Sequence, residues 1–114
     1  MTFEQLRVFI AVAERLHVTQ AAAALNMTQS AASAAVQALE SGLGTKLFNR
    51  VGRHIELTEA GRVFLPEARA VVKRLAQAGQ TLAELEGLER GRLALWASQT
   101  IAGYFLPRFI ARFH

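Results

Sequence analysis

Apolar residues recur at helical spacing along most of the chain, and short polar segments divide this pattern into separate helices. Thr2 and Gln5 form a capping-box pair at the start of a helix that runs to about Leu16. Thr19 is placed to cap a second, short helix, and Asn26 after it tolerates the left-handed backbone of a tight turn. The first part of the chain therefore predicts two helices with a sharp corner after the second.

A third helix is predicted directly after this corner, which Met27 is expected to fill. Thr28 can cap the helix, which extends from Gln29 to about Leu43 and is closed by Gly42 and Gly44. The second and third helices thus predict a helix, turn, helix arrangement.

The segment LFNRVGRHIEL, from Leu47 to Leu57, changes from helical to alternating periodicity. Its two short alternating pieces flank Arg50, Val51, Gly52 and Arg53. We interpret it as a two-stranded hairpin with these residues between the strands, placed after the third helix as a wing.

A long helix follows, capped by Thr58 and extending from Glu59 to about Leu88, with a bend expected near Pro66. Its apolar positions step alternately by four and three residues, as in a coiled coil. This seam contains Phe64, Ala68, Val71, Leu75, Ala78, Leu82 and Leu85. So small a core cannot cover the whole seam, and a second copy of the chain is expected to pair through Phe64, Val71, Leu75, Leu82 and Leu85.

The last part of the chain predicts a strand at Leu93–Ala97, followed by an apolar segment that suits a helix. One strand and one helix cannot bury their own apolar faces, so this part is interpreted as the start of a further domain. The expected organisation is a first domain at 1–58, a long linker helix at 59–90 and the beginning of a further domain at 91–114.

Composition supports a soluble protein: 52% of the 114 residues are hydrophobic and 19% are charged. The absence of cysteine excludes disulfides and thiolate metal sites, and no apolar run reaches the roughly 20 residues that span a bilayer. A cytoplasmic location is expected. The formal charge of +4 is concentrated at Arg92, Arg108 and Arg112, since residues 1–57 hold five basic against four acidic side chains. Net charge by itself therefore says little about nucleic acids.

Two faces of the predicted third helix differ in chemistry. One contains Gln29, Ser30, Ser33, Ala34 and Gln37, and the other contains Ala32, Ala35, Val36, Leu39 and Leu43. In the major groove of DNA, glutamine can bond adenine, serine can bond several bases, and an alanine methyl can pack on thymine. An ordinary solvated helix face has a similar composition, so the order of the elements supports the DNA-binding interpretation more than this face alone.

Cations for the phosphate backbone are expected from the hairpin, because the polar face of the third helix has no long charged side chain. The candidate DNA-binding residues are Thr28, Gln29, Ser30, Ser33, Ala34 and Gln37 on the helix and Lys46, Arg50, Arg53 and His54 at the hairpin.

The run VTQAAAALNMTQSAASAAVQALESGLGTKLFNRVGRHIELTEAGRVFL resembles the winged helix-turn-helix of LysR-type transcriptional regulators. Its landmarks are paired alanines, LE, LG, LF-x-R and LT-x-A-G, and the continuation GRLALWASQTIAGYFLPRFIARF is similar to the start of that family's effector domain. The resemblance implies a mainly α fold with a wing and a long linker helix, followed by the first strand and helix of an α/β domain. Members often carry proline where Ser30 stands and arginine where Ala34 stands, which bears on how much affinity the helix supplies.

The resemblance also implies roles and partners. Gln29 and Ser33 would contact DNA from the recognition helix, Arg50 and Arg53 from the wing, and Ser98 and Thr100 would border an inducer pocket. The implied partners are double-stranded DNA at a dyad-symmetric site, a second copy in a dimer or a full-length tetramer, and a small, often anionic inducer. Plain helix capping remains an alternative role for Ser98 and Thr100.

Other functions have weaker support in the sequence. His17, His54 and His114 lack metal-ligand spacing, and Ser98 lacks the glycines of a nucleophile elbow, so we expect no metal, no cofactor and no enzyme. Two alternatives remain: a helical dimerisation module without DNA binding, and a peripheral membrane anchor formed by Arg92–His114. We expect no membrane partner.

Overall fold

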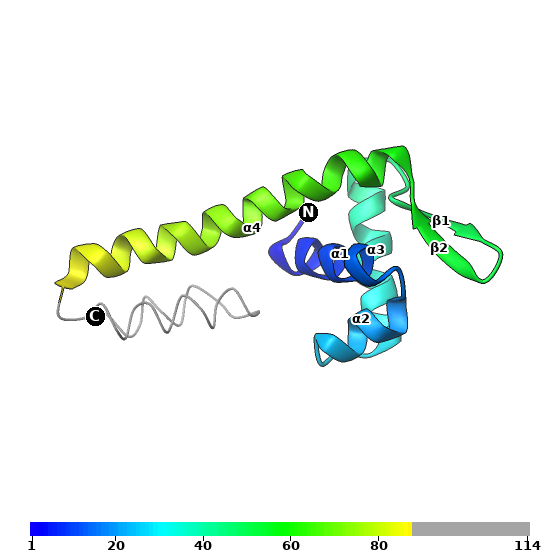
Figure 1. Ribbon diagram of the computed structural model, residues 1–114, viewed down its shortest axis with the longest axis horizontal. Helices are drawn as coiled ribbons and strands as arrows, with labels where there is room; N and C mark the ends of the chain where they lie inside the picture. The colour runs from blue at the N-terminus through cyan, green and yellow to red at the C-terminus, as the bar shows by residue number, and fades with distance from the viewer. Residues whose placement is uncertain (88–114) are drawn as a thin grey trace. The chain divides into compact units, whose positions relative to one another are not determined.

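A computed structural model describes residues 1–87 (Figure 1). Its elements, in chain order, are α1 (Phe3–Arg15), α2 (Val18–Ala24), α3 (Gln29–Leu43), β1 (Phe48–Val51), β2 (His54–Leu57) and α4 (Glu59–Glu86). This is a mainly helical winged helix-turn-helix followed by a long helix, as the sequence predicts. The strand and helix expected after residue 91 lie outside the described residues.

Helix α1 begins with the predicted capping box. The Thr2 hydroxyl accepts from the Gln5 amide, and the Gln5 side chain accepts in return from the Thr2 amide. The helix ends at Leu16, whose left-handed backbone (φ 51°) turns the chain toward α2.

The start of α2 corrects one prediction, because its N-cap is His17 rather than Thr19. Nδ1 of His17 accepts a hydrogen bond of 3.1 Å from the amide of Gln20, and Thr19 lies inside the helix. Val18 packs against the core, so the helix starts at that residue, one position before Thr19. An imidazole nitrogen then replaces the expected hydroxyl as the acceptor.

The corner between α2 and α3 is as predicted. Asn26 takes a left-handed backbone (φ 57°), and partly buried Met27 packs against the core. Thr28 caps α3 by accepting from the amide of Ala31, and left-handed Gly44 (φ 72°) ends it.

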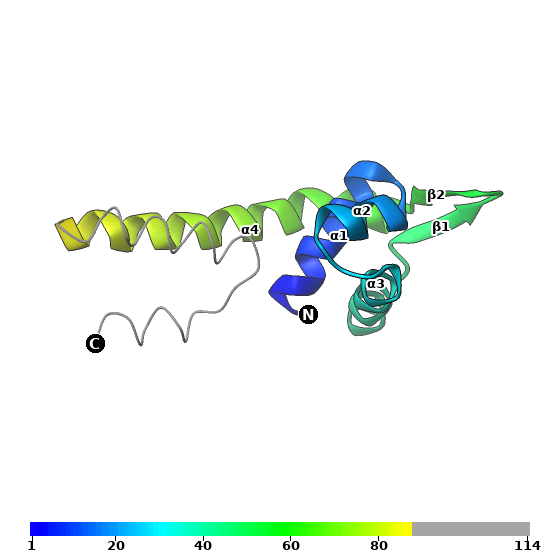
Figure 2. The same cartoon turned by 90° about the horizontal axis from the view of Figure 1, so that it is seen from below.

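Alanines bring the three helices of the domain close together. Ala21 and Ala22 of α2 and Ala32 of α3 are buried in one cluster with Val8 and Val12 of α1. Because the side chain at each of these α2 and α3 positions is only a methyl group, α3 can pack closely against α1 and α2. The outer face of α3 remains exposed. Figure 2 shows α3 nearly end-on, beside α1 and α2.

Phe9 of α1 joins the wing and the beginning of α4 to the same core. Its fully buried ring lies 5.5 Å from the ring of Phe48 in β1 and 5.4 Å from that of Phe64 in α4, centroid to centroid. Both pairs are tilted, an arrangement that aromatic quadrupoles favour. The compact unit that contains them is Met1–Ala70, so it includes the first turns of α4.

The wing is an antiparallel pair of strands with the register Phe48↔Leu57 to Val51↔His54. Its turn is therefore only Gly52 and Arg53, with Gly52 at a positive φ of 61° as in a type II′ turn. The sequence-based placement of Arg50 and Val51 between the strands was wrong. Both residues belong to β1, because the cross-strand pairing continues to the edge of the two-residue turn.

Helix α4 begins at the predicted cap, where the Thr58 hydroxyl accepts from the Gly61 amide at 2.9 Å. It continues through Pro66 to Glu86 as one helix, and its predicted end near Leu88 lies outside the described residues. None of the helices among residues 1–87 combines the length and hydropathy that crossing a bilayer requires.

Candidate nucleic-acid interface

The two predicted faces of α3 are those of the structure. Ala32, Val36 and Leu39 are buried. The opposite face is exposed at Gln29, Ser30, Ala34 and Gln37 and half-buried at Ser33. The exposed face thus offers amides, hydroxyls and a methyl group, with no charged side chain among them.

Strand alternation places the wing's polar side chains on different faces. Arg50 pairs with Ile55, and both share a face with Phe48, whereas Asn49, Val51 and His54 point the other way. Arg53 lies in the turn at the tip. Arg50 and Arg53 therefore occupy different parts of the wing, although the sequence-based prediction placed them together in one loop.

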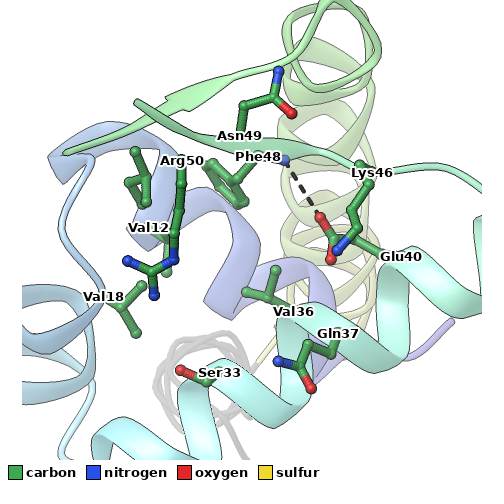
Figure 3. Close-up of a pocket in the computed structure, with 11 residues that line it drawn as sticks. Val12, Val18, Ser33, Val36, Gln37, Glu40, Lys46, Phe48, Asn49 and Arg50 are labelled. Atoms are coloured by element: carbon green, nitrogen blue, oxygen red, sulfur yellow. Dashed lines mark hydrogen bonds between the residues drawn. The ribbon is translucent and has the colours of Figure 1, made fainter. Parts of the chain in front are cut away.

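A groove of about 400 Å³ separates α3 from the wing (Figure 3). Ser33 and Gln37 line its helix side, and Lys46 and Arg50 line its wing side. Its floor is apolar and includes Val12, Val18, Val36 and Ile55. In Figure 3 the Arg50 side chain extends past Val12 toward Val18, while Asn49 points away from it. Two cations thus border a depression beside the candidate base-reading face.

The cations of this surface make no ion pair with any side chain of residues 1–87. The salt bridges there join Glu4 to Arg7 and Glu14 to Arg15 and Arg69. Lys46, Arg50, Arg53 and His54 are all exposed. Within the described part of the chain they remain available to an external anion.

Two residues of this region were not identified from the sequence alone. Asn49 lines the groove margin, and Glu40 accepts hydrogen bonds from the amides of Leu47 and Phe48. Strand alternation could have separated Asn49 from Arg50. The partners of Glu40 are backbone amides that follow the non-helical segment after α3, and no sequence pattern predicts this pairing.

The predicted dimerisation residues differ in exposure. Phe64 is half-buried against Phe9, so part of its apolar surface is already used within the chain. Val71 is 53% exposed and Leu85 79% exposed, while Leu75 and Leu82 are intermediate.

Two further predictions concern the inducer pocket and metal binding. Ser98 and Thr100 lie outside the described residues. Among residues 1–87, no group of three or more histidine, aspartate or glutamate side chains is arranged to hold a metal ion.

Curated relatives match almost the whole chain. The RuBisCO operon transcriptional regulator of Allochromatium vinosum is 40% identical over 113 residues, which are 99% of this chain and 37% of that protein. The HTH-type transcriptional regulator ShiR of Corynebacterium glutamicum (strain R) is 42% identical over 114 residues, which are 100% of this chain and 39% of that protein. The chain therefore spans less than two fifths of the length of these relatives.

Solved structures match the fold. The crystal structure of the CbnR DNA-binding domain in complex with DNA has a TM-score of 0.72 and 40% identity, and the match covers 75% of this chain and 99% of that one. The complex of the BenM DNA-binding domain with benA site 1 DNA has a TM-score of 0.72 and 30% identity, covering 75% and 97%.

A family model describing bacterial regulatory helix-turn-helix proteins of the lysR family matches residues 3–62. That family consists of transcriptional regulators, which confirms the prediction that the chain is not an enzyme. The chain belongs to the LysR family of transcriptional regulators and carries its DNA-binding helix-turn-helix region.

Proposed function

We propose that the chain binds double-stranded DNA as a homodimer, with α3 in the major groove and the wing on the neighbouring backbone and minor groove. One observation carries this proposal: the uncharged polar face of α3 lies beside a groove bordered by Lys46 and Arg50. Amides and hydroxyls suit base edges, and unpaired cations suit phosphates. The likeness to the CbnR and BenM complexes with DNA supports it.

The position of each exposed side chain on α3 suggests its role in DNA binding. Gln29 and Gln37, with Ser33 between them, would bond base edges, and the methyl group of Ala34 would contact thymine. Thr28 and Ser30, at the N-terminal end of α3, would contact the nearest phosphates.

The wing would contact the sugar-phosphate backbone. Lys46 and Arg50 border the α3–wing groove, which would receive the strand that separates the major from the minor groove. Arg53 at the tip and His54 beside it extend the contact outward along that backbone.

Dimerisation would occur through α4. Val71 and Leu85 are more than half exposed in the single chain, which supports a partner along the seam. Two copies would present their α3 helices to successive major grooves about 34 Å apart, and the preferred site would be dyad-symmetric. In a protein of its relatives' length we further propose tetramers and control by a small inducer that binds near Ser98 and Thr100.

The alternative of a dimerisation module without DNA binding does not fit a family of DNA-binding regulators. The membrane-anchor alternative rests on residues 92–114, outside the described part of the chain. We propose action in the cytoplasm, where a bacterial regulator meets its DNA.

The test is a titration of the 114-residue chain with labelled duplexes that this chain selects from a random-sequence library, repeated over a range of salt concentrations. If Lys46, Arg50 and Arg53 of both subunits neutralise about six phosphates, the slope of log K against log salt has a magnitude of about 5. A flat response, or a failure to select any duplex, would contradict the proposal.

Arg53→Ala should weaken binding to all sequences alike and lower the magnitude of the slope. The matched control is Arg74→Ala, which removes the same charge from an exposed position of α4. Equal losses from the two variants would show that net charge, rather than the wing, is responsible.

A further inference from the structure

The carboxylate of Glu40 joins the last turns of α3 to the segment that leads into the wing. Its Oε2 accepts hydrogen bonds from the backbone amides of Leu47, at 2.8 Å, and Phe48, at 3.3 Å. Figure 3 marks the bond to Phe48. Leu47 precedes β1 and its side chain is fully buried. Among residues 1–87, these are the hydrogen bonds that connect α3 with Leu47 and Phe48.

The same segment is held from the side of α4 by Thr58. The Thr58 amide donates to the carbonyl of Leu47 at 3.0 Å, and its hydroxyl donates to the carbonyl of Lys46 at 2.7 Å. Thr58 follows β2, so its bonds close the base of the hairpin. Thr58 thus connects the wing with α4, whereas Glu40 connects it with α3.

Electrostatics alone does not account for an acid at position 40. Glu40 lines the same groove as Lys46 and Arg50, and a carboxylate there repels a phosphate. It is the one acidic residue of α3. Its two backbone hydrogen bonds provide a reason for its presence that DNA contact does not.

We propose that Glu40 is a positioning residue, which fixes the wing relative to the base-reading face of α3 so that both engage DNA together. The inference rests on the proposed function. The two hydrogen bonds hold the start of β1 on α3 and so fix the direction in which the wing extends from the helix. Arg53 at the tip of the wing then keeps a fixed position relative to Gln29 and Ser33.

Two substitutions separate reach from charge. Glu40→Gln keeps the length of the side chain and a carbonyl oxygen that can accept both hydrogen bonds, but removes the charge. Glu40→Asp keeps the charge but withdraws the carboxylate by one methylene. We expect Glu40→Gln to behave as the parent chain, and we expect the wing of Glu40→Asp to have no fixed orientation relative to α3.

The first readout is a double-mutant cycle with Arg53→Ala, measured on duplexes that the parent chain selects from a random-sequence library. In the parent, Arg53→Ala should weaken binding about tenfold, the effect of one charge-assisted contact. In the Glu40→Asp background that loss should shrink by at least about threefold, because a displaced wing makes the contact less often. In the Glu40→Gln background it should stay at the parental value.

The outcomes distinguish the alternatives. An unchanged Arg53 effect in Glu40→Asp would overturn the proposal, because the reach of the side chain would then not matter. An equal reduction in both variants would also overturn it, because Glu40→Gln keeps the reach and the acceptor oxygen and should not lose the effect. Glu56→Gln, which removes an exposed wing carboxylate, is the control for repulsion of DNA. If the parent chain selects no duplex, the proposed function fails instead.

The second readout needs no DNA. The sequence contains no cysteine, so Ser41→Cys on α3 and Val51→Cys on β1, both at exposed positions, accept spin labels selectively. With excess unlabelled chain, the distance distribution should be narrow in the parent and in Glu40→Gln, and broad in Glu40→Asp. If Glu40→Asp does not fold, Glu40→Gln decides: a broadened distribution in that variant would contradict the proposal.

Discussion

The guanidinium of Arg69 on α4 donates a hydrogen bond of 3.2 Å to Oε2 of Glu14 on α1. This pair lies in the same compact unit as the Phe9–Phe64 contact. The two contacts fix the first turns of α4 on α1 at two points along the helix. Phe64 supplies an apolar contact, and Arg69, about one turn later, supplies a polar contact with the same helix.

Arg69→Ala should lower the free energy of unfolding by about 0.2–1 kcal/mol, because both side chains are about half exposed and water screens the pair. Chemical denaturation at low and high salt would measure it, with the difference shrinking at high salt. Lys73→Ala, at an exposed position one turn later, is the control. The double variant Glu14→Ala with Arg69→Ala completes the cycle. If its loss in the free energy of unfolding equals the sum of the losses of the two single variants, the pair itself adds no stability.

Gly61→Ala should destabilise the chain by about 1–3 kcal/mol, the usual cost of overpacking. A Cβ at Gly61 would press on the carbonyl of Leu47 and lie 2.8 Å from Cδ2 of Leu57. The matched control is Gly42→Ala in α3, where an added Cβ meets no atom within 4 Å outside the local helix backbone and the helix should gain up to about 1 kcal/mol. Thermal unfolding of the two variants should therefore shift in opposite directions. A shift of both in the same direction would contradict this packing argument.

Gln29→Ala should cost about 1–3 kcal/mol of binding on selected duplexes and little on mixed-sequence DNA, because an amide that pairs with one base edge discriminates between sequences. Gln80→Ala, at an exposed position on α4, should change neither. Competition titrations with both kinds of duplex measure the difference. Equal losses on the two duplexes would assign Gln29 to backbone contact.

Leu75→Glu should convert a dimer into a monomer. Two glutamates that face each other in a seam lose apolar contact and cannot both be solvated, which costs several kcal/mol. Sedimentation equilibrium measures the association, and Gln80→Glu, on the opposite side of α4, should leave it intact. An unchanged dimer in Leu75→Glu would place the interface elsewhere.

The sequence predicted most of the helix boundaries because their signals are local. Thr2, Thr28 and Thr58 cap helices through amides three residues ahead, so the required partner is always within reach. The two faces of α3 were likewise predictable, since helical periodicity alone separates Val36 from Gln37.

The errors and omissions involve partners that are not implied by sequence spacing. His17 replaced Thr19 as a cap because packing of Val18 decides where α2 begins. Arg50 belongs to a strand because the register with Ile55 decides where the turn begins. Glu40 bonds amides seven and eight residues ahead, across a connection whose course depends on the buried Leu47.

The two ends of the wing respond differently to changes in chain length. At its base, every inserted residue between Gly44 and Phe48 would shift backbone groups away from Glu40 and Thr58. At its tip, a Cβ added to Gly52 would meet no atom within 4 Å apart from its chain neighbours. Two added residues in each strand would extend the hairpin by about 7 Å and keep every side chain on its present face. Insertions at the tip therefore offer a way to lengthen the proposed contact of the wing with the DNA backbone without altering the proposed base-reading face of α3.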